Sequence, residues 1–328
     1  MNKKLVLIIS SLFLVQIVVY LYTHYNSDKI NAEVKVLNIN YEPTQNGVLR
    51  LEHKNLPTIP TGILKYKKEL WRIYLGDNDF TEFPYELLSM PNLHTIHIES
   101  NKITSLDFSN LDLKYCALTE LVIYNNKITE IKGLERFPSL KKIEIQRNNL
   151  SKIPLLPKSI NEADFSRNKI TTLNMSTIPP KLKRLMVNDN LLNSIIPSPE
   201  SADYELITLG IQRNPIDTLV IDSQTIAPVL RELYLEGLVS QQIAITHPNL
   251  ERLVMNYKET RMVNLDLPKL KVLSIPIKSL VHEINQFNAP KVEDLYIYKS
   301  KSYNFQEIRE ATTAKFPLAK VTLMDAND

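Results

Sequence analysis

The chain has 328 residues, with 39 Lys and Arg against 36 Asp and Glu, and a formal net charge of +3. This near-neutral balance argues against a nucleic-acid-binding protein, which would carry a basic stripe. Cys116 is the single cysteine, which excludes an intramolecular disulfide, and only six glycines and no Ser/Gly-rich linker interrupt the chain. One elongated domain is therefore expected.

The first residues predict a membrane anchor. Lys3 and Lys4 precede residues 5–22, which carry no charge, and a helix of that length rises about 27 Å, close to the roughly 30 Å of a bilayer core. The residues that follow lack the small side chains of a signal-peptide cleavage site. We expect residues 1–4 to be a cytoplasmic tip, 5–22 a signal anchor that crosses the membrane as a helix, and 23–32 a linker.

The localisation that follows is a single-pass membrane protein with its repeats outside the cytoplasm, in the periplasm or at the cell surface. The alternative is a cleaved signal peptide and a secreted chain.

A repeated unit follows, with apolar residues at the spacing L-x-x-L-x-L-x-x-N. Its clearest copy is Leu70, Ile73, Leu75 and Asn78. Ile73 and Leu75 alternate with the period of two that turns one face of a short strand inward, and the Asn falls where the chain leaves the strand. One strand and one return segment cannot bury their own apolar face, so the units must stack and the end units need caps.

The third apolar position of each unit recurs mostly every 20 to 25 residues. It falls at Leu51, Leu75, Ile98, Ile123, Ile145, Phe165, Val187, Ile211, Leu235, Met255, Ile275, Ile297 and Leu323. This spacing and the motif resemble the leucine-rich repeat. The resemblance implies a solenoid of α/β type, or a mainly β horseshoe, of about 12–13 repeats, with a concave parallel sheet and short 3-10 or extended convex segments.

The return segments make the chain similar to bacterial members of that family. Residues 153–160 and 178–182 contain prolines and resemble the short extended segments of bacterial repeats. Animal extracellular members usually have disulfide-bonded caps, which a single cysteine cannot form. We expect a repeat domain over 33–328, with a cap strand within 33–45 and a cap helix and strand within 305–324.

The asparagines of the motif predict a structural ladder, because each amide can satisfy backbone groups of the neighbouring turn. The ladder consists of Asn78, Asn101, Asn126, Asn148, Asn168, Asn190 and Asn214. Later units place Leu238, Lys258, Lys278 and Ser300 at this position. We therefore expect the C-terminal third to be less regular.

No catalytic signature is present. The sequence contains no P-loop, no G-x-S-x-G and no dinucleotide fingerprint, and its six histidines lack metal-ligand spacing. Cys116 reads as a small buried apolar residue. We expect no enzyme activity, no cofactor and no metal.

The concave face carries the candidate binding residues, because Tyr, Trp and Arg are enriched at binding hot spots. These are Trp71, Tyr74, His97, Tyr124, Arg147, Arg167, Arg213, Tyr234, Tyr257, Tyr296 and Tyr298. The structural alternative is that aromatic residues simply favour strands, and that Glu144 and Asp164 neutralise Arg147 and Arg167.

The function expected by analogy is an exported, membrane-anchored module that binds another protein through its concave face. One alternative is a secreted bacterial virulence factor that binds a host protein. The other is a module that binds carbohydrate or a cell-wall polymer through its aromatic patches.

Overall fold

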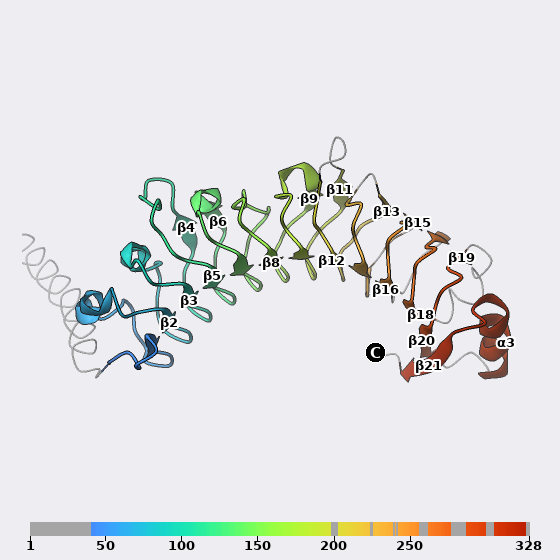
Figure 1. Cartoon of the computed structure of the whole chain (residues 1–328), viewed down its shortest axis with the longest axis horizontal. Coiled ribbons are helices and arrows are strands. Elements are labelled where there is room, and N and C mark those ends of the chain that lie inside the picture. The colour runs from blue at the N-terminus through green and yellow to red at the C-terminus, as the bar shows by residue number, and fades with distance from the viewer. Residues whose placement is uncertain are drawn as a thin grey trace, which may run out of the picture.

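The computed structural model describes residues 41–325, except 198–202, 224–225, 239, 241, 256–261, 277–286 and 300–304. The chain winds into a curved solenoid whose strands follow one another from the N-terminal to the C-terminal end (Figure 1). The predicted tip, anchor and linker lie outside the described residues, as does most of the predicted N-terminal cap strand.

A parallel sheet of thirteen strands lines the concave side of the solenoid. In spatial order these are β1 (Val48–Arg50), β2 (Arg72–Tyr74), β3 (Thr95–His97), β5 (Glu120–Val122), β7 (Lys142–Glu144), β8 (Glu162–Asp164), β10 (Arg184–Met186), β12 (Thr208–Gly210), β14 (Glu232–Tyr234), β16 (Arg252–Val254), β18 (Val272–Pro276), β20 (Asp294–Lys299) and β21 (Lys320–Asp325). Neighbouring strands pair so that equivalent repeat positions lie side by side, as Ile73 does with Ile96. The parallel solenoid is the architecture that the repeat predicts.

The number of turns is smaller than the sequence predicted. About 11 solenoid turns connect β1 to β20. The last strand, β21, instead follows helix α3 (Phe305–Lys315), so the step between β20 and β21 is not a regular turn. The expected 12–13 repeats are corrected accordingly.

The return segments are short 3-10 helices or extended stretches, as predicted. The 3-10 helices are η1 (Thr61–Tyr66), η2 (Tyr85–Ser89), η3 (Leu134–Arg136) and η4 (Met175–Thr177). The extended stretches are β4 (Ser105–Asp107), β6 (Glu130–Lys132), β9 (Thr172–Asn174), β11 (Ser194–Ile196), β13 (Thr218–Asp222), β15 (Gln242–Thr246), β17 (Met262–Asp266) and β19 (Phe287–Asn288). Between turns they form three small parallel sheets, β4–β6, β9–β11 and β13–β15–β17–β19, which the sequence did not predict.

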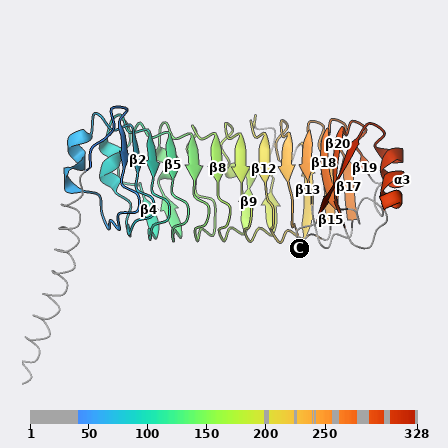
Figure 2. The same ribbon diagram turned by 90° about the horizontal axis from the view of Figure 1, so that it is seen from below.

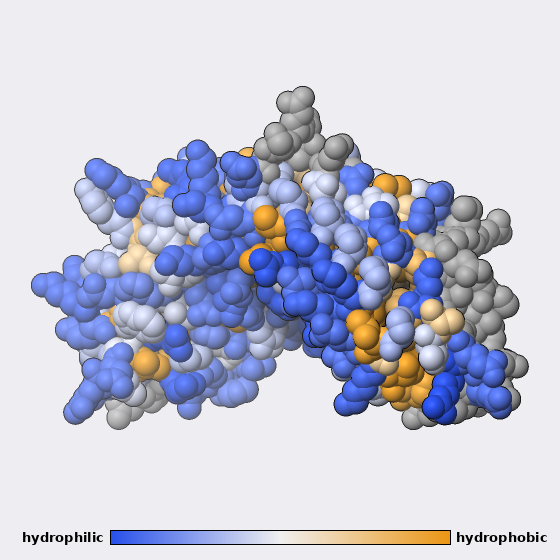
Figure 3. All heavy atoms as spheres, turned by 45° about the vertical axis from the view of Figure 1, so that its right-hand side comes forward, coloured by the Kyte–Doolittle hydropathy of each residue, from blue (hydrophilic) through white to orange (hydrophobic). Residues whose placement is uncertain are grey.

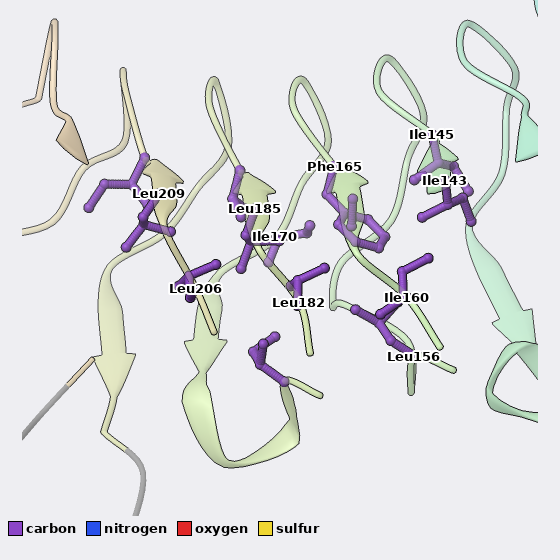
Figure 4. Packing of buried hydrophobic residues seen from close by; sticks show 14 of the residues in the cluster. Ile143, Ile145, Leu156, Ile160, Phe165, Ile170, Leu182, Leu185, Leu206 and Leu209 are labelled. Atoms are coloured by element: carbon purple, nitrogen blue, oxygen red, sulfur yellow. The ribbon is translucent and has the colours of Figure 1, made fainter. Parts of the chain in front are cut away.

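One continuous apolar core runs between the two sides of the solenoid. Ile73 and Leu75 are fully buried, and their equivalents in the concave strands from β1 to β20 are buried as well. Figure 4 shows Phe165, Leu185 and Leu209 pointing into this interior from successive turns. Cys116 is buried in the core, and burial raises the pKa of its thiol.

The asparagines join successive turns through hydrogen bonds. Asn101 Oδ1 accepts the backbone N–H of Phe80 at 3.0 Å, and its Nδ2 donates to the carbonyl of Leu75 at 3.0 Å, both in the preceding turn. The same Nδ2 also donates to Ile98 and Glu99 in its own turn. The same bonding pattern recurs at Asn78, Asn126, Asn148, Asn168, Asn190 and Asn214.

The residue before each ladder asparagine adopts the left-handed backbone conformation, with φ between 51° and 58°, namely at Asp77, Ser100, Asn125, Arg147, Arg167, Asp189 and Arg213. His53 and Gly237 do the same at the equivalent positions of the turns before and after the ladder, with φ 55° and 64°. This conformation is costly for residues with a Cβ, by about 1–2 kcal/mol each. Each solenoid corner therefore depends on the bonds around it, a feature that the sequence pattern did not predict.

Several strands of the C-terminal third are longer than those of the N-terminal part, and the lower regularity expected there stays a prediction. Strands β13, β15, β17 and β18 have five residues each and β20 and β21 have six, against three in β2 or β3. Where the ladder ends, Leu238 is fully buried, so an apolar contact replaces the amide. Longer backbone pairing thus accompanies the loss of the asparagines. Lys258, Lys278 and Ser300 lie outside the described residues.

The predicted localisation as a single-pass membrane protein with its repeats outside the cytoplasm is contradicted. Across the residues that the structure describes, no helix combines the length and the apolar character needed to cross a membrane. A span needs about 20 apolar residues, whereas α3 has 11 residues. Residues 5–22, on which the prediction rested, are not among the described residues, and neither a transmembrane helix nor a signal anchor is supported.

Candidate functional site

The concave surface is built from side chains that alternate with the core residues. Tyr74 lies between the buried Ile73 and Leu75 and therefore points out of the sheet. The strand register aligns a first row, which begins Arg50, Tyr74, His97 and Val122. Two positions further along each turn, a second row contains Glu99, Tyr124, Gln146, Asn188, Gln212 and Glu236. Figure 2 shows the strands of this sheet face on.

Four rings meet in two stacked pairs at the N-terminal end, and we call Trp71, Tyr74, His94 and His97 the N-terminal aromatic cluster. The rings of Tyr74 and His97 stack with centroids 4.5 Å apart, and those of Trp71 and His94 stack at 5.3 Å. The guanidinium of Arg50 lies 4.1 Å from the centroid of the Tyr74 ring. Cation–π contact and stacking fix the rings in place before any ligand arrives.

His94 is a member of the cluster that sequence reasoning missed. It occupies the position of Trp71 in the next turn, and its backbone N–H donates to the carbonyl of Trp71 at 2.9 Å. The repeat pattern could have identified His94 as a neighbour of Trp71, because equivalent positions of adjacent turns lie side by side.

Two candidate residues are placed differently from expectation. Trp71 precedes β2 and lies at the rim of the sheet, where 43% of its surface is exposed. Tyr124 belongs to the second row, not to the row of Tyr74 and His97. Burial and nearby carboxylates, including that of Glu99, raise the pKa of Tyr124.

Polar groups beside the cluster are incompletely satisfied. Within the described residues, three buried side-chain atoms have no hydrogen-bond partner, namely Arg72 Nε, Glu99 Oε2 and Gln146 Oε1. Arg72 lies in β2, and Glu99 and Gln146 lie in the second row of the concave surface, two residues after the ends of β3 and β7. His97 Nδ1 lies 3.8 Å from Glu99 Oε2, and burial lowers the pKa of His97 and raises that of Glu99. This part of the face therefore retains unused hydrogen-bonding capacity.

The three arginines lie at corners with positive φ, along one rim of the sheet. Arg213 Nη2 donates to Asp189 Oδ2 at 2.7 Å, and Arg167 Nε lies 3.7 Å from the same oxygen. The bond from Arg213 lowers the pKa of Asp189.

The expected pairing of the arginines with Glu144 and Asp164 is wrong. Arg167 pairs with Asp189 of the next turn, and Glu144 pairs with Lys142 at 2.7 Å. Among the ion pairs of the described residues, Arg147 takes part in none, so its guanidinium is the least neutralised of the three.

The C-terminal tyrosines are already engaged with carboxylates. Tyr298 Oη donates to Glu236 Oε1 at 2.9 Å, and Tyr234 Oη donates to Glu232 Oε2 at 3.3 Å. Burial raises the pKa of both phenols. Tyr296 lies in the first row, next to Ser274 of β18. Tyr257 falls outside the described residues, so the structure does not unite these tyrosines in one cluster.

A metal site has no support in the part of the chain that the structure describes, where no group of three or more His, Cys, Asp or Glu side chains could hold an ion. That the chain is not an enzyme and takes no cofactor stays a prediction.

Comparison with known proteins supports the repeat. A family model described as leucine-rich repeats in two copies matches residues 116–158. An uncharacterized leucine-rich-repeat-containing protein of Schizosaccharomyces pombe is 30% identical over 118 residues, which are 36% of this chain and 19% of that protein. Opticin of Bos taurus is 29% identical over 160 residues, 46% of this chain and 47% of opticin. Podocan of Mus musculus is 26% identical over 234 residues, 62% of this chain and 37% of podocan.

The chain thus spans less than half the length of each of these relatives. They come from a fungus and from mammals, so a bacterial origin stays a prediction.

Solved structures share the fold. The leucine-rich-repeat domain of APL1B superposes with a TM-score of 0.52 at 18% identity, over 93% of both chains. An internalin, InlF, from Listeria monocytogenes gives 0.52 at 15% identity, over 86% of this chain and 87% of that one. The repeated motif, the family model matched over residues 116–158 and the parallel solenoid make the chain similar to leucine-rich-repeat proteins in sequence pattern and in fold.

Proposed function

We propose that this chain is an interaction module that binds another protein through its concave face, with the N-terminal aromatic cluster as the anchor. The observation that carries the proposal is the presence of two stacked ring pairs at one end of the concave sheet. Trp71 stacks on His94 at the rim of the sheet, and Tyr74 stacks on His97 on its concave surface. Repeat solenoids use such extended concave surfaces for binding.

The exposure and stacking of the rings favour the N-terminal end of the concave face as the binding site. Trp71 is 43% exposed, so a partner can still bury a large part of its surface. Because its ring is already stacked on His94, little side-chain entropy remains to be lost on binding. The hydroxyls of Tyr234 and Tyr298, in contrast, already bond to carboxylates.

The unsatisfied polar atoms support the same region. Glu99 Oε2 and Gln146 Oε1 are buried without hydrogen-bond partners in the described chain. Such an atom costs roughly 1–3 kcal/mol relative to a satisfied one. A partner that shifts these side chains and supplies donors would recover part of that free energy.

Arg147 is the second contact that we propose. It lies at the rim beyond the second row and forms no ion pair with a described residue, whereas Arg167 and Arg213 share Asp189. An arginine with a free guanidinium can form a bidentate contact with a partner carboxylate.

Paired alanine variants test the anchor. The double change Trp71→Ala with Tyr74→Ala should abolish capture of the protein partner from an extract of the source cells, because an aromatic hot spot contributes at least about 2 kcal/mol. Tyr115→Ala is the matched control, since Tyr115 is exposed but belongs to a return segment away from the concave sheet. It should capture the partner normally.

The result can distinguish three possibilities. Loss of the partner only in Trp71→Ala with Tyr74→Ala supports the anchor. Loss only in a Tyr296→Ala with Tyr298→Ala variant would move the site to the C-terminal end. Elution of the bound material by soluble glycans, with no protein in the eluate, would make the concave face a carbohydrate-binding surface instead.

A further inference from the structure

Strand β21 ends the large sheet with an open edge. Among the described strands it pairs only with β20. Lys320 donates its backbone N–H to Glu293 at 2.7 Å, on the β20 side. In a parallel pair both backbone groups of one residue face the same neighbour, so those of Thr322 and Met324 also face β20. The groups of Val321, Leu323 and Asp325 therefore face outward, where they can pair with another strand.

Apolar side chains accompany this edge. Val321 lies in the core-facing row beside Leu295, yet 40% of its surface is exposed whereas Leu295 is fully buried. Met324 and Leu318 are also exposed, and Figure 3 shows apolar surface on the C-terminal side of the molecule. At the opposite end Leu49 of β1 is only 1% exposed. Terminal repeats normally need a polar outer face, and in the described chain β21 does not provide one.

We propose that β21 is the interface of a homodimer, in which the edges of two copies pair antiparallel about a two-fold axis. The two concave sheets then join into one longer sheet. This proposal is independent of the function proposed for the N-terminal aromatic cluster, which lies at the other end of the solenoid (Figure 1).

The sequence of β21 is complementary to itself. With Thr322 opposite Thr322 of the second copy, Val321 of each copy lies opposite Leu323 of the other. Both residues present their backbone groups to the edge, so these are hydrogen-bonded pairs, and their side chains cover each other on the core side.

A second copy fits this edge better than head-to-tail stacking does. Pairing of β21 with β1 of another molecule would not close and would produce filaments. β1 has only three residues and its Leu49 is already covered, so it offers a shorter edge and no apolar partner for Val321.

Sedimentation of the full chain tests the dimer. The chain mass is 37.8 kDa, so two copies weigh 2 × 37.8 = 75.6 kDa. Val321→Lys places a charge in the interface of both copies and should raise the dissociation constant by about tenfold or more. Leu155→Lys adds the same charge at an exposed apolar side chain of a return segment between β7 and β8, and should leave the dimer intact. A monomeric wild type, a filament, or an undiminished dimer in Val321→Lys would overturn the proposal.

A disulfide tests the register without relying on folding of the lysine variant. In the proposed pairing the two Thr322 residues form a non-hydrogen-bonded pair with Cα atoms about 4.5 Å apart, within the range of a disulfide. Thr322→Cys should therefore give a covalent dimer under mild oxidation of the native protein but not in denaturant. Thr313→Cys, at an exposed position of α3, is the control and should remain monomeric on a non-reducing gel. Equal cross-linking of both variants, or none at residue 322, would contradict this interface.

Discussion

Asn148 Oδ1 accepts the backbone N–H of Ile128, in the preceding turn, at 2.9 Å. The Nδ2 of the same side chain donates to Ile123 and Ile145, so one amide connects the carbonyls of two turns. All these groups are buried and have no access to water, which makes the asparagine the link between neighbouring turns.

The first prediction concerns this link. Asn148→Ala should lower the free energy of unfolding by about 1–3 kcal/mol or more, because it leaves buried backbone groups without partners. Asn110→Ala, at an exposed position of a return segment, should change it by less than about 0.5 kcal/mol. Urea denaturation followed by circular dichroism measures both, and equal shifts would show that the ladder contributes nothing beyond an ordinary surface amide.

The second prediction concerns the solenoid corners. Gly237 has φ 64°, and a Cβ there would lie 2.7 Å from Arg213 Cγ. Gly237→Ala should therefore destabilise the fold by about 1–2 kcal/mol. Gly237→Asn should cost less than a β-branched Gly237→Val, because Asn tolerates the left-handed region. Thermal melting of the three variants gives the order of their stabilities. A Val variant as stable as the Asn variant would argue against backbone strain at this corner.

The third prediction concerns Asp189, whose pKa the bond from Arg213 lowers. A depressed folded-state pKa means that the stabilisation is complete above the unfolded value of about 3.9. It is lost as the pH falls through the lower folded-state pKa. Asp189→Asn should therefore lower the melting temperature at neutral pH, and the difference from the wild type should shrink steadily below about pH 4.

Arg213→Gln is the control for that pH dependence. This variant removes the donor that lowers the pKa of Asp189. It should therefore show the same drop in melting temperature at neutral pH, and its melting temperature should approach that of the wild type in acid. A difference between wild type and Asp189→Asn that stays constant down to the lowest pH would show that the ion pair does not contribute to stability.

The fourth prediction concerns Cys116, whose thiol is buried and has a raised pKa. Because only the thiolate reacts readily, the native protein should react with a thiol reagent far more slowly than the protein in denaturant. The time course of modification at neutral pH measures this. Immediate reaction in the native state would place Cys116 at the surface.

The repeat alone predicted the rows of the concave sheet, because its period fixes which residues face the core. Ile73, Leu75 and their equivalents up to β20 are buried as expected, and Tyr74 and His97 share an outward row. The predictions that failed concern contacts between side chains of different turns, which depend on how the turns are aligned in space. The Arg167–Asp189 pair joins residues of adjacent turns, and Tyr298 reaches Glu236 across 62 residues of sequence.

Other features were missed because they are properties of the backbone. The left-handed residue before each ladder asparagine is an Asp, Ser, Asn or Arg, so no residue type marks it. The convex sheets arise where extended return segments of neighbouring turns come into register, as Leu219 does with Ile243. Neither feature changes the apolar spacing from which the solenoid was predicted.

The most direct test of the concave face as a binding surface uses Trp71, the single tryptophan of the chain. Fluorotryptophan incorporation gives one fluorine resonance from a ring that is 43% exposed in the free protein. Addition of the captured partner should shift or broaden that resonance in proportion to complex formation, and Tyr115→Ala should behave identically. A resonance that stays unchanged when the chain is saturated with its partner would contradict the proposal that the N-terminal aromatic cluster is the anchor.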